Sequence, residues 1–286
     1  MFARAPASSA NLGPGFDALG LALDLHVEVE VQPAARLEIV TTGEGNELPR
    51  TAAHLAAAVA CRVAGHDSLY VRVHSDIPVG RGLGSSAALA VAAAAAAGSL
   101  DPLAEGCRVD GHPENAAASA LGGLVAAAVV DGIPTARRLP LDPALRAVLV
   151  VPDRWLATRD ARAVLPEKVP FADATFNLGR LGLLVAGLGD HRALVPGAFA
   201  DRLHQDARGS LFPEAGPLLA GLAAAGALGA CWSGAGPSLL ALALEASTEA
   251  LAGAARSLVD DLGVPASVVV RSFDTDGVRV WSEPPH

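Results

Sequence analysis

A glycine-rich turn that runs directly into an alanine-rich stretch constrains this chain more than any other feature. The turn reads Gly-Arg-Gly-Leu-Gly-Ser-Ser over residues 80–86, and residues 87–97 are all alanine except Leu89 and Val91. Alanine has the highest helix propensity, so we expect a helix there with the two serines at its N-cap. Glycines let the backbone approach an anion, and the free N–H groups of a helix start point toward it. The segment is therefore a candidate phosphate-binding loop.

The glycine-rich turn fits neither of the two common nucleotide motifs. Residue 85 is serine, which excludes the Gly-x-Gly-x-x-Gly pattern of dinucleotide-binding folds, and no lysine follows, which excludes the P-loop. Lys168 is the only lysine, so the cations of any anion site are arginines. A plain structural turn explains such a segment equally well, and a ligand role requires a third type of phosphate loop.

The rest of the chain mixes strands and helices without regular βαβ alternation, which predicts an α+β fold in two lobes. Two-residue periodicity or apolar runs predict strands at 26–31, 70–74, from 122, 147–151, 237–243 and 267–270. Helical patterns span 51–64, opened by Thr51, and 159–164, 171–188 and 216–225. We also expect 268–270 and 278–280 to form a hairpin across Asp276-Gly277.

Composition excludes several classes of function. The 286 residues carry 21 Lys and Arg against 30 Asp and Glu, a net charge of −9, which gives no electrostatic reason to bind nucleic acid or anionic lipid. Three scattered cysteines do not make a disulfide framework or a thiolate zinc site. The longest apolar run, 87–97, is well short of the ~20 residues of a membrane span, and the N-terminus lacks an apolar signal core. We therefore expect a soluble cytoplasmic protein.

Two further segments are rich in turn-forming residues. Residues 6–17 read Pro-Ala-Ser-Ser-Ala-Asn-Leu-Gly-Pro-Gly-Phe-Asp and place an amide, Asn11, and a carboxylate, Asp17, before an apolar strand. Residues 231–238 form a second glycine-rich turn, Cys-Trp-Ser-Gly-Ala-Gly-Pro-Ser. Taken singly, the first fits an ordinary hairpin with an Asx turn, and the second is more often a turn than a site.

Together these segments resemble the GHMP kinase superfamily. Residues 78–88 are similar to its phosphate-binding motif, 231–238 to its C-terminal glycine-rich motif, and 6–17 to the homoserine kinase version of its first motif. Gly-His-Pro-Glu-Asn at 111–115, followed by Leu-Gly-Gly at 121–123, and the segments 158–166 and 201–205 also resemble that family. The matches run in order from residue 4 to beyond 270, so the resemblance covers nearly the whole chain.

The resemblance implies a fold and an activity. The fold is a two-lobed GHMP kinase-like α+β fold, with a mixed-sheet N-terminal lobe at 1–148 and a ferredoxin-like α/β sandwich lobe at 149–286. The activity is transfer of the γ-phosphoryl group of ATP, with Mg²⁺, to the hydroxyl of L-homoserine in threonine biosynthesis. The family also implies a homodimer. Alternatives are a sister kinase on another small alcohol, an inactive relative that binds nucleotide or amino acid, and a dinucleotide-binding oxidoreductase.

The resemblance also assigns roles to residues. Arg162 and Arg208 hold the substrate carboxylate, because an arginine fork suits that group. Asp17 and Asn11 meet the amino and hydroxyl end, near a histidine, a glutamate and an asparagine of the 111–115 element. The substrate-binding set is thus Asn11, Asp17, His112, Glu114, Arg162 and Arg208. The ATP-binding set is Pro78, Gly80, Arg81, Gly82, Leu83, Gly84, Ser85 and Ser86.

Catalysis is expected to involve Asn115, Asp17 and Arg162. Asn115 stands where related kinases have a basic aspartate, and because an amide cannot take a proton, positioning and charge stabilisation should dominate. Asp17 stays open as a proton acceptor.

Three departures from the family pattern affect the site. Glu114 and Asp110 replace a usual aspartate and glutamate, so the Mg²⁺ ligands are Ser86 with either Asp110 or Glu105. Residues 206–209 read Asp-Ala-Arg-Gly where Pro-Tyr-Arg-Ala is common, so Arg208 is kept in a changed loop. His54 also stands where an asparagine is expected near the nucleotide base.

Overall fold

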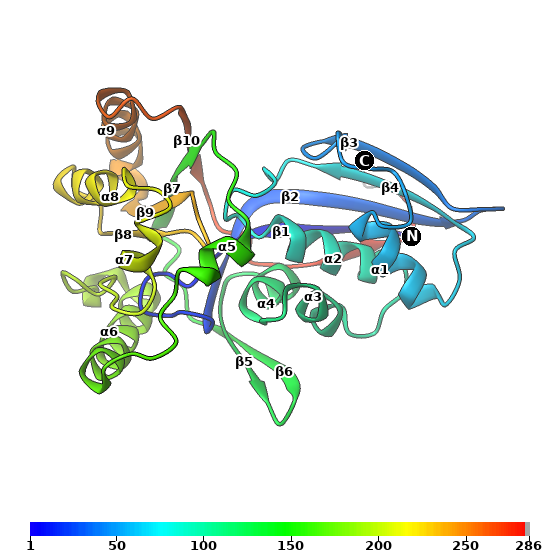
Figure 1. The fold of residues 1–286 in the computed structure, drawn as a ribbon, viewed down its shortest axis with the longest axis horizontal. Coiled ribbons are helices and arrows are strands. Elements are labelled where there is room, and N and C mark those ends of the chain that lie inside the picture. The colour runs from blue at the N-terminus through cyan, green and yellow to red at the C-terminus, as the bar shows by residue number, and fades with distance from the viewer. Residues whose placement is uncertain (284–286) are drawn as a thin grey trace.

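Two β-sheets divide the protein into two lobes (Figure 1), which confirms the expected α+β class. The computed structural model describes residues 1–283. The strands are β1 (Phe2–Ala10), β2 (Leu19–Pro33), β3 (Glu38–Gly43), β4 (Leu69–Ser75), β5 (Leu124–Val130), β6 (Ile133–Leu139), β7 (Leu145–Pro152), β8 (Gly229–Trp232), β9 (Leu239–Leu244), β10 (Ala266–Arg271) and β11 (Arg279–Trp281). The α-helices are α1 (Leu55–Ala64), α2 (Ser85–Ala96), α3 (Pro102–Asp110), α4 (Glu114–Leu121), α5 (Thr158–Ala163), α6 (Phe171–Gly189), α7 (Gln205–Arg208), α8 (Ala215–Ala224) and α9 (Thr248–Asp261).

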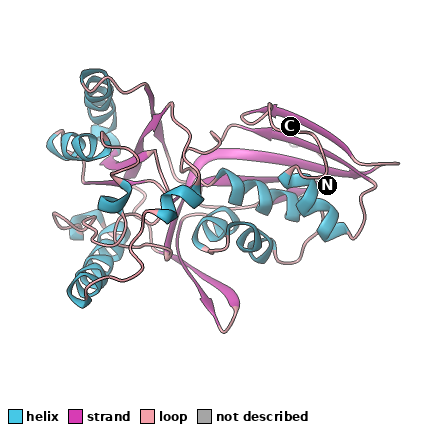
Figure 2. Cartoon of the chain, viewed as in Figure 1, coloured by secondary structure: helices cyan, strands magenta, loops and turns pink. Residues whose placement is uncertain are grey.

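The first sheet is mixed, as expected. Its main path runs β11-β1-β2-β4-β3, and only the β3–β4 pair is parallel. The long strand β2 joins two regions, because its beginning pairs with β5 and its end pairs with β4. Between these regions the register of β2 against β1 shifts at Pro6/Ala7, and Asp24 and Leu25 of β2 have no partner in β1. The β5–β6 hairpin projects from the body of the lobe (Figure 2).

Helix α2 is the centre of the N-terminal core. Almost all of its alanines are fully buried, and it contacts α1, α3 and α4 as well as β1 and β2. Small side chains allow this close approach from several sides, so a helix of alanine is buried here rather than amphipathic. The predicted helix is confirmed, but its predicted serine N-cap is wrong. The N-cap is Gly84 in the left-handed conformation, and Ser85 and Ser86 are the first helical residues.

The second sheet has the expected ferredoxin-like arrangement. Its four strands are all antiparallel in the order β10-β7-β9-β8, and the chain runs β7, helices, β8, β9, α9, β10. Helices α8 and α9 cover one face (Figure 2), where leucines of both helices pack against the valines of β7. Within residues 1–283, no helix combines the length and the apolar character needed to cross a membrane.

Two expectations differ from the structure, one about the start of a helix and one about the pairing of a strand. Helix α1 begins at Leu55 instead of Thr51, because residues 51–54 form a separate turn. The hairpin expected across Asp276-Gly277 is also wrong: β10 pairs with β7, and β11 pairs with β1 of the first sheet. Asp274 Oδ1 accepts hydrogen bonds from the N–H groups of residues 276 and 277, and this Asx turn directs the chain to the other lobe. The expected lobe boundary at 148/149 falls within β7.

Candidate active site

A cavity of about 370 Å³ brings together segments that are far apart in the sequence. It lies where the phosphate-loop segment, the 111–115 element and helix α5 meet, and α5 sits between the two lobes (Figure 1). All six predicted substrate-binding residues line it, together with Asn115, Asp110 and most of the predicted ATP-binding loop. Pro78, Arg81 and Glu105 are not among the lining residues.

The loop from 80 to 86 is held in shape by the second glycine-rich turn. Gly82 has φ +75°, and a Cβ there would lie 2.4 Å from the carbonyl oxygen of Ser233. Ser233 Oγ donates to the Gly82 carbonyl at 2.8 Å. Gly84, with φ +65°, leaves α2 without a side-chain cap. The amides of the first helical turn, which lack intrahelical partners, are therefore left for a ligand.

The N-terminal loop is backbone-strained and is closed by Asn11. Asn11, Leu12 and Asp17 all have positive φ, an unfavourable conformation for residues with side chains. The Asn11 amide donates to the carbonyl of Gly234 at 2.9 Å, and its Oδ1 accepts from the Asp17 N–H at 3.0 Å. Strain of this kind persists only where surrounding contacts enforce it, and it concentrates at functional sites.

Arg162 and Asp17 form a two-point ion pair inside the cavity. The two guanidinium N–H groups donate to the two carboxylate oxygens at 2.5 and 3.1 Å. Both side chains are about one-third exposed. The ring of Phe16 lies 5.4 Å from the guanidinium carbon of Arg162 and 5.5 Å from that of Arg208. One aromatic ring thus lies close to two cations, next to one carboxylate.

Arg208 is buried and held by neutral partners. It donates to the carbonyl of Gly234 at 2.9 Å and to Nδ1 of His204 at 3.0 Å. Burial, with the nearby charge of Arg162, lowers the pKa of Arg208 to about 10, so it stays protonated at neutral pH. His204 Nε2 donates to the carbonyl of Gly13 at 2.8 Å, which leaves Nδ1 as the acceptor. Burial lowers the pKa of His204 to about 4, which keeps the ring neutral.

Glu114 is a buried carboxylate with one free oxygen. It begins α4, is 1% exposed, and contacts His112 Nδ1 through Oε1 at 2.6 Å. Among residues 1–283, no group hydrogen-bonds its Oε2. Burial acts to lower the pKa of His112, but the bond and charge of Glu114 outweigh it and raise the pKa. An unpaired buried oxygen is costly, so Oε2 marks a place for a donor on a ligand.

The two candidate magnesium carboxylates have different environments. Asp110 and Ser86 both line the cavity. Burial raises the pKa of Asp110 to about 6, against the opposing effects of His112 and Ser86. Glu105 instead accepts a hydrogen bond from Arg62 at 2.9 Å, outside the cavity. The geometry therefore favours the Ser86–Asp110 pair and does not bring Glu105 to the site.

A second recess of about 310 Å³ adjoins the cavity and shares Val79, Ser85 and Ser86 with it. Its walls are mostly apolar, with His54 as a buried polar group whose Nδ1 has no partner among residues 1–283. Burial lowers the pKa of His54, so the ring is neutral at neutral pH. A flat apolar recess with one such ring suits an aromatic base.

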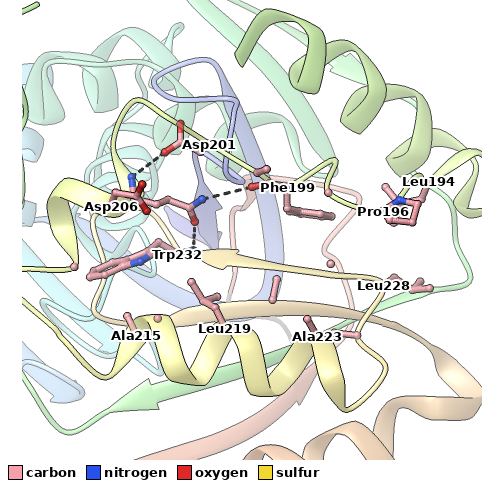
Figure 3. Close-up of a pocket in the computed structure, with 18 of the residues that line it drawn as sticks. Leu194, Pro196, Phe199, Asp201, Asp206, Ala215, Leu219, Ala223, Leu228 and Trp232 are labelled. Carbon is pink, nitrogen blue, oxygen red and sulfur yellow. Dashed lines mark hydrogen bonds between the residues drawn. The ribbon is translucent and has the colours of Figure 1, made fainter. Parts of the chain in front are cut away.

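A larger cavity, about 830 Å³, lies elsewhere, between β8, α8 and the loop before α7 (Figure 3). Its walls are mainly apolar. The side chain of Gln205 bridges two backbone groups there, accepting from Trp232 N–H at 2.9 Å and donating to the Phe199 carbonyl at 3.4 Å. None of the predicted site residues lines it. The charged and chemically active groups gather in the smaller cavity, which is therefore the candidate active site.

Sequence reasoning missed several contributors to this site. His204 lies in a segment that resembles the family, yet nothing in the pattern indicates that it supports Arg208. Trp155 and Thr158 line the cavity from the segment before α5 and within it. Thr158 begins the 158–166 segment that resembles the family, and Trp155 lies just before it, but neither signal selects the residue as part of the site.

Comparison with known proteins agrees with this geometry. The N-terminal domain model of the GHMP kinases matches residues 48–123, and the C-terminal model matches residues 178–260. A homoserine kinase of Solibacter usitatus is 41% identical, with 83% of each chain covered, and one of Desulfitobacterium hafniense is 35% identical, with 97% of this chain and 98% of that one covered.

Solved structures show the same relationship. A crystal structure of homoserine kinase from Cytophaga hutchinsonii superimposes with a TM-score of 0.85 at 28% identity, covering 98% of this chain and 96% of that one. The mevalonate kinase of L. major shares the fold, with a TM-score of 0.67 at 15% identity, covering 96% of this chain and 95% of that one. The chain belongs to the homoserine kinase family of the GHMP kinases.

Proposed function

We propose that the protein transfers the γ-phosphoryl group of ATP to the hydroxyl of L-homoserine, giving O-phospho-L-homoserine in threonine biosynthesis. The observation that carries this proposal is the convergence of Arg162, Arg208 and Asp17 beside an uncapped helix start in one cavity. A zwitterionic amino acid needs cations and a carboxylate at close quarters, and a triphosphate needs free amides.

When the amino acid binds, its charged groups replace the contacts that Arg162 and Asp17 make with each other. In the structure Arg162 is paired with Asp17. A bound amino acid supplies its own carboxylate to Arg162 and Arg208, and its ammonium group to Asp17 and to Oδ1 of Asn11. The free Oε2 of Glu114 is a further acceptor for the ammonium or the hydroxyl. A ligand with only one of the two charges leaves part of this set unpaired, which disfavours simple alcohols.

The nucleotide is bound on the other side of the cavity. The triphosphate lies on the amides of Gly82 to Ser86, and the base enters the recess that contains His54. Ser86 and Asp110 are the Mg²⁺ ligands; oxygen donors of this kind suit that cation. When bound, Mg²⁺ would neutralise charge on the phosphates.

Asn115 orients the attacking hydroxyl instead of deprotonating it. Its Oδ1 is fixed by Ser8 Oγ at 2.8 Å, and its amide nitrogen lies 3.3 Å from Glu114 Oε1. Phosphoryl transfer passes through a loose transition state, in which positioning and charge stabilisation supply most of the rate. Arg162 contributes positive charge to the acceptor side of the cavity. Proton acceptance by Asp17 remains a secondary proposal.

A coupled ADP-release assay over homoserine, threonine, mevalonate and galactose tests the proposal. Turnover on homoserine, with O-phosphohomoserine identified by phosphorus NMR, is the expected result. Turnover on another alcohol alone would favour a sister kinase, and ATP binding with no turnover would favour an inactive relative. The dinucleotide alternative has lost its support, because a kinase family model matches the loop region. The homodimer and the cytoplasmic location stay predictions.

A further inference from the structure

Trp155 is an exposed aromatic side chain at the edge of the candidate active site. It is 64% exposed, whereas Trp232 is 1% exposed. Burying an indole stabilises a fold because it removes a large apolar area from water. Trp155 contributes little of this stabilisation, since most of its side chain is exposed. Its position is therefore not explained by packing of the core.

The backbone on both sides of Trp155 is anchored. Arg81 donates to the Asp153 carboxylate at 2.7 Å, and the Leu156 N–H donates to the Gly80 carbonyl at 3.0 Å. Arg154, which directly precedes Trp155, has its guanidinium 5.3 Å from the centre of the Phe212 ring. These contacts join the segment to the phosphate loop and to the C-terminal lobe at once. The segment that carries the exposed indole is therefore fixed by its neighbours on both sides in the sequence.

The indole lies directly against the phosphate loop. A Cβ on Gly80 would come within 1.9 Å of Trp155 Cδ1, so the ring occupies the space that any larger residue at position 80 would need. Trp155 lines the same cavity as Ser86 and Arg162, and the chain continues from it into α5. The ring thus stands on the solvent side of the space between the phosphate loop and the acceptor arginine.

We propose that Trp155 shields the reacting phosphoryl group from water and so favours the amino-acid hydroxyl as acceptor. This inference rests on the proposed function. Water is the competing nucleophile: its oxygen would bond to the γ-phosphorus, the bond from that phosphorus to the β-bridging oxygen would break, and ADP, phosphate and a proton would be released. An aromatic ring over the loop excludes water by its bulk.

The test measures how ATP is divided between the two acceptors. ADP release and O-phosphohomoserine are measured in the same reaction for the wild type, Trp155→Ala and Trp155→Phe. We expect the fraction of ATP that is hydrolysed by water to rise roughly tenfold in Trp155→Ala, because the free energy of about one aromatic contact corresponds to such a factor. In Trp155→Phe the fraction should return near the wild-type value. Phe171→Ala is the matched control, because Phe171 is 85% exposed outside the cavity; it should leave the division unchanged.

An unchanged hydrolysed fraction in Trp155→Ala, or a Phe variant as leaky as the Ala variant, would overturn the proposal. Melting temperatures of the variants separate shielding from misfolding. ATP hydrolysis without any acceptor gives a second reading that does not depend on homoserine. This acceptor-free hydrolysis rate should also rise in Trp155→Ala. If it rises while the wild type does not phosphorylate homoserine, the proposed substrate is wrong, but the proposal that Trp155 shields the phosphoryl group stands.

Discussion

Replacing Arg162 with alanine should raise the KM for homoserine and leave the KM for ATP nearly unchanged. This guanidinium makes two hydrogen bonds to the carboxylate of Asp17, the same kind of contact that is proposed for the substrate carboxylate. Hydrogen bonds to charged groups contribute about 1.5–3 kcal/mol, equivalent to roughly 10–150-fold in affinity. Because Arg162 is about one-third exposed and Arg208 remains as a second cation, we expect the lower part of that range.

The assay is initial-rate ADP release over a homoserine series at saturating ATP, and over an ATP series at saturating homoserine. Arg159→Ala is the matched control, because Arg159 lies on the same helix with its side chain 90% exposed. Arg162→Lys keeps the charge but loses the fork, so its KM should lie between those of the wild type and the alanine variant. Equal increases in both KM values, or an Arg162→Ala enzyme that matches Arg159→Ala, would refute the carboxylate-binding role.

Three other substitutions test separate parts of the site. Asp110→Asn should raise the Mg²⁺ concentration needed for the half-maximal rate at least about tenfold. Glu105→Gln should leave it unchanged, because the carboxylate of Glu105 pairs with Arg62. If the two variants depend on Mg²⁺ concentration in the same way, the assignment of Asp110 as a Mg²⁺ ligand is wrong. The pKa of His204 is about 4 in the folded protein and 6.5 for the free side chain. Because the unfolded chain therefore binds a proton first as the pH falls, the free energy of unfolding should drop by up to about 3 kcal/mol between pH 6.5 and 4. Urea titrations should show that His204→Gln lacks this drop. Gly82→Ala, which meets a carbonyl oxygen at 2.4 Å, should lower the melting temperature more than Gly98→Ala, which meets nothing within 4 Å; equal shifts would mean that only backbone conformation matters.

The sequence was most informative where a function is encoded in consecutive residues. The phosphate loop, the strained turn ending at Asp17 and the 111–115 element are contiguous motifs, and the structure brings all three to one cavity. The alanine run predicted α2 correctly because high helix propensity and burial agree there. The serine N-cap failed because Gly84 adopts a left-handed conformation that only the tertiary packing of the loop specifies.

Long-range partners were the part that sequence patterns did not specify. The Asp276-Gly277 turn was correctly seen as a turn, but its hydrogen bonds to Asp274 direct β11 to the first sheet. Glu105 and Asp110 lie on one helix five residues apart and so on different faces, and only the packing of α3 decides which face meets the loop. The support of Arg208 by His204 likewise depends on where α7 docks.

A ternary complex with homoserine and an unreactive ATP analogue tests the central claim most directly. The crystal structure is expected to show the triphosphate on the amides of Gly82 to Ser86 and the amino-acid carboxylate between Arg162 and Arg208. A triphosphate bound away from this loop, or an amino acid that contacts neither arginine, would contradict the account.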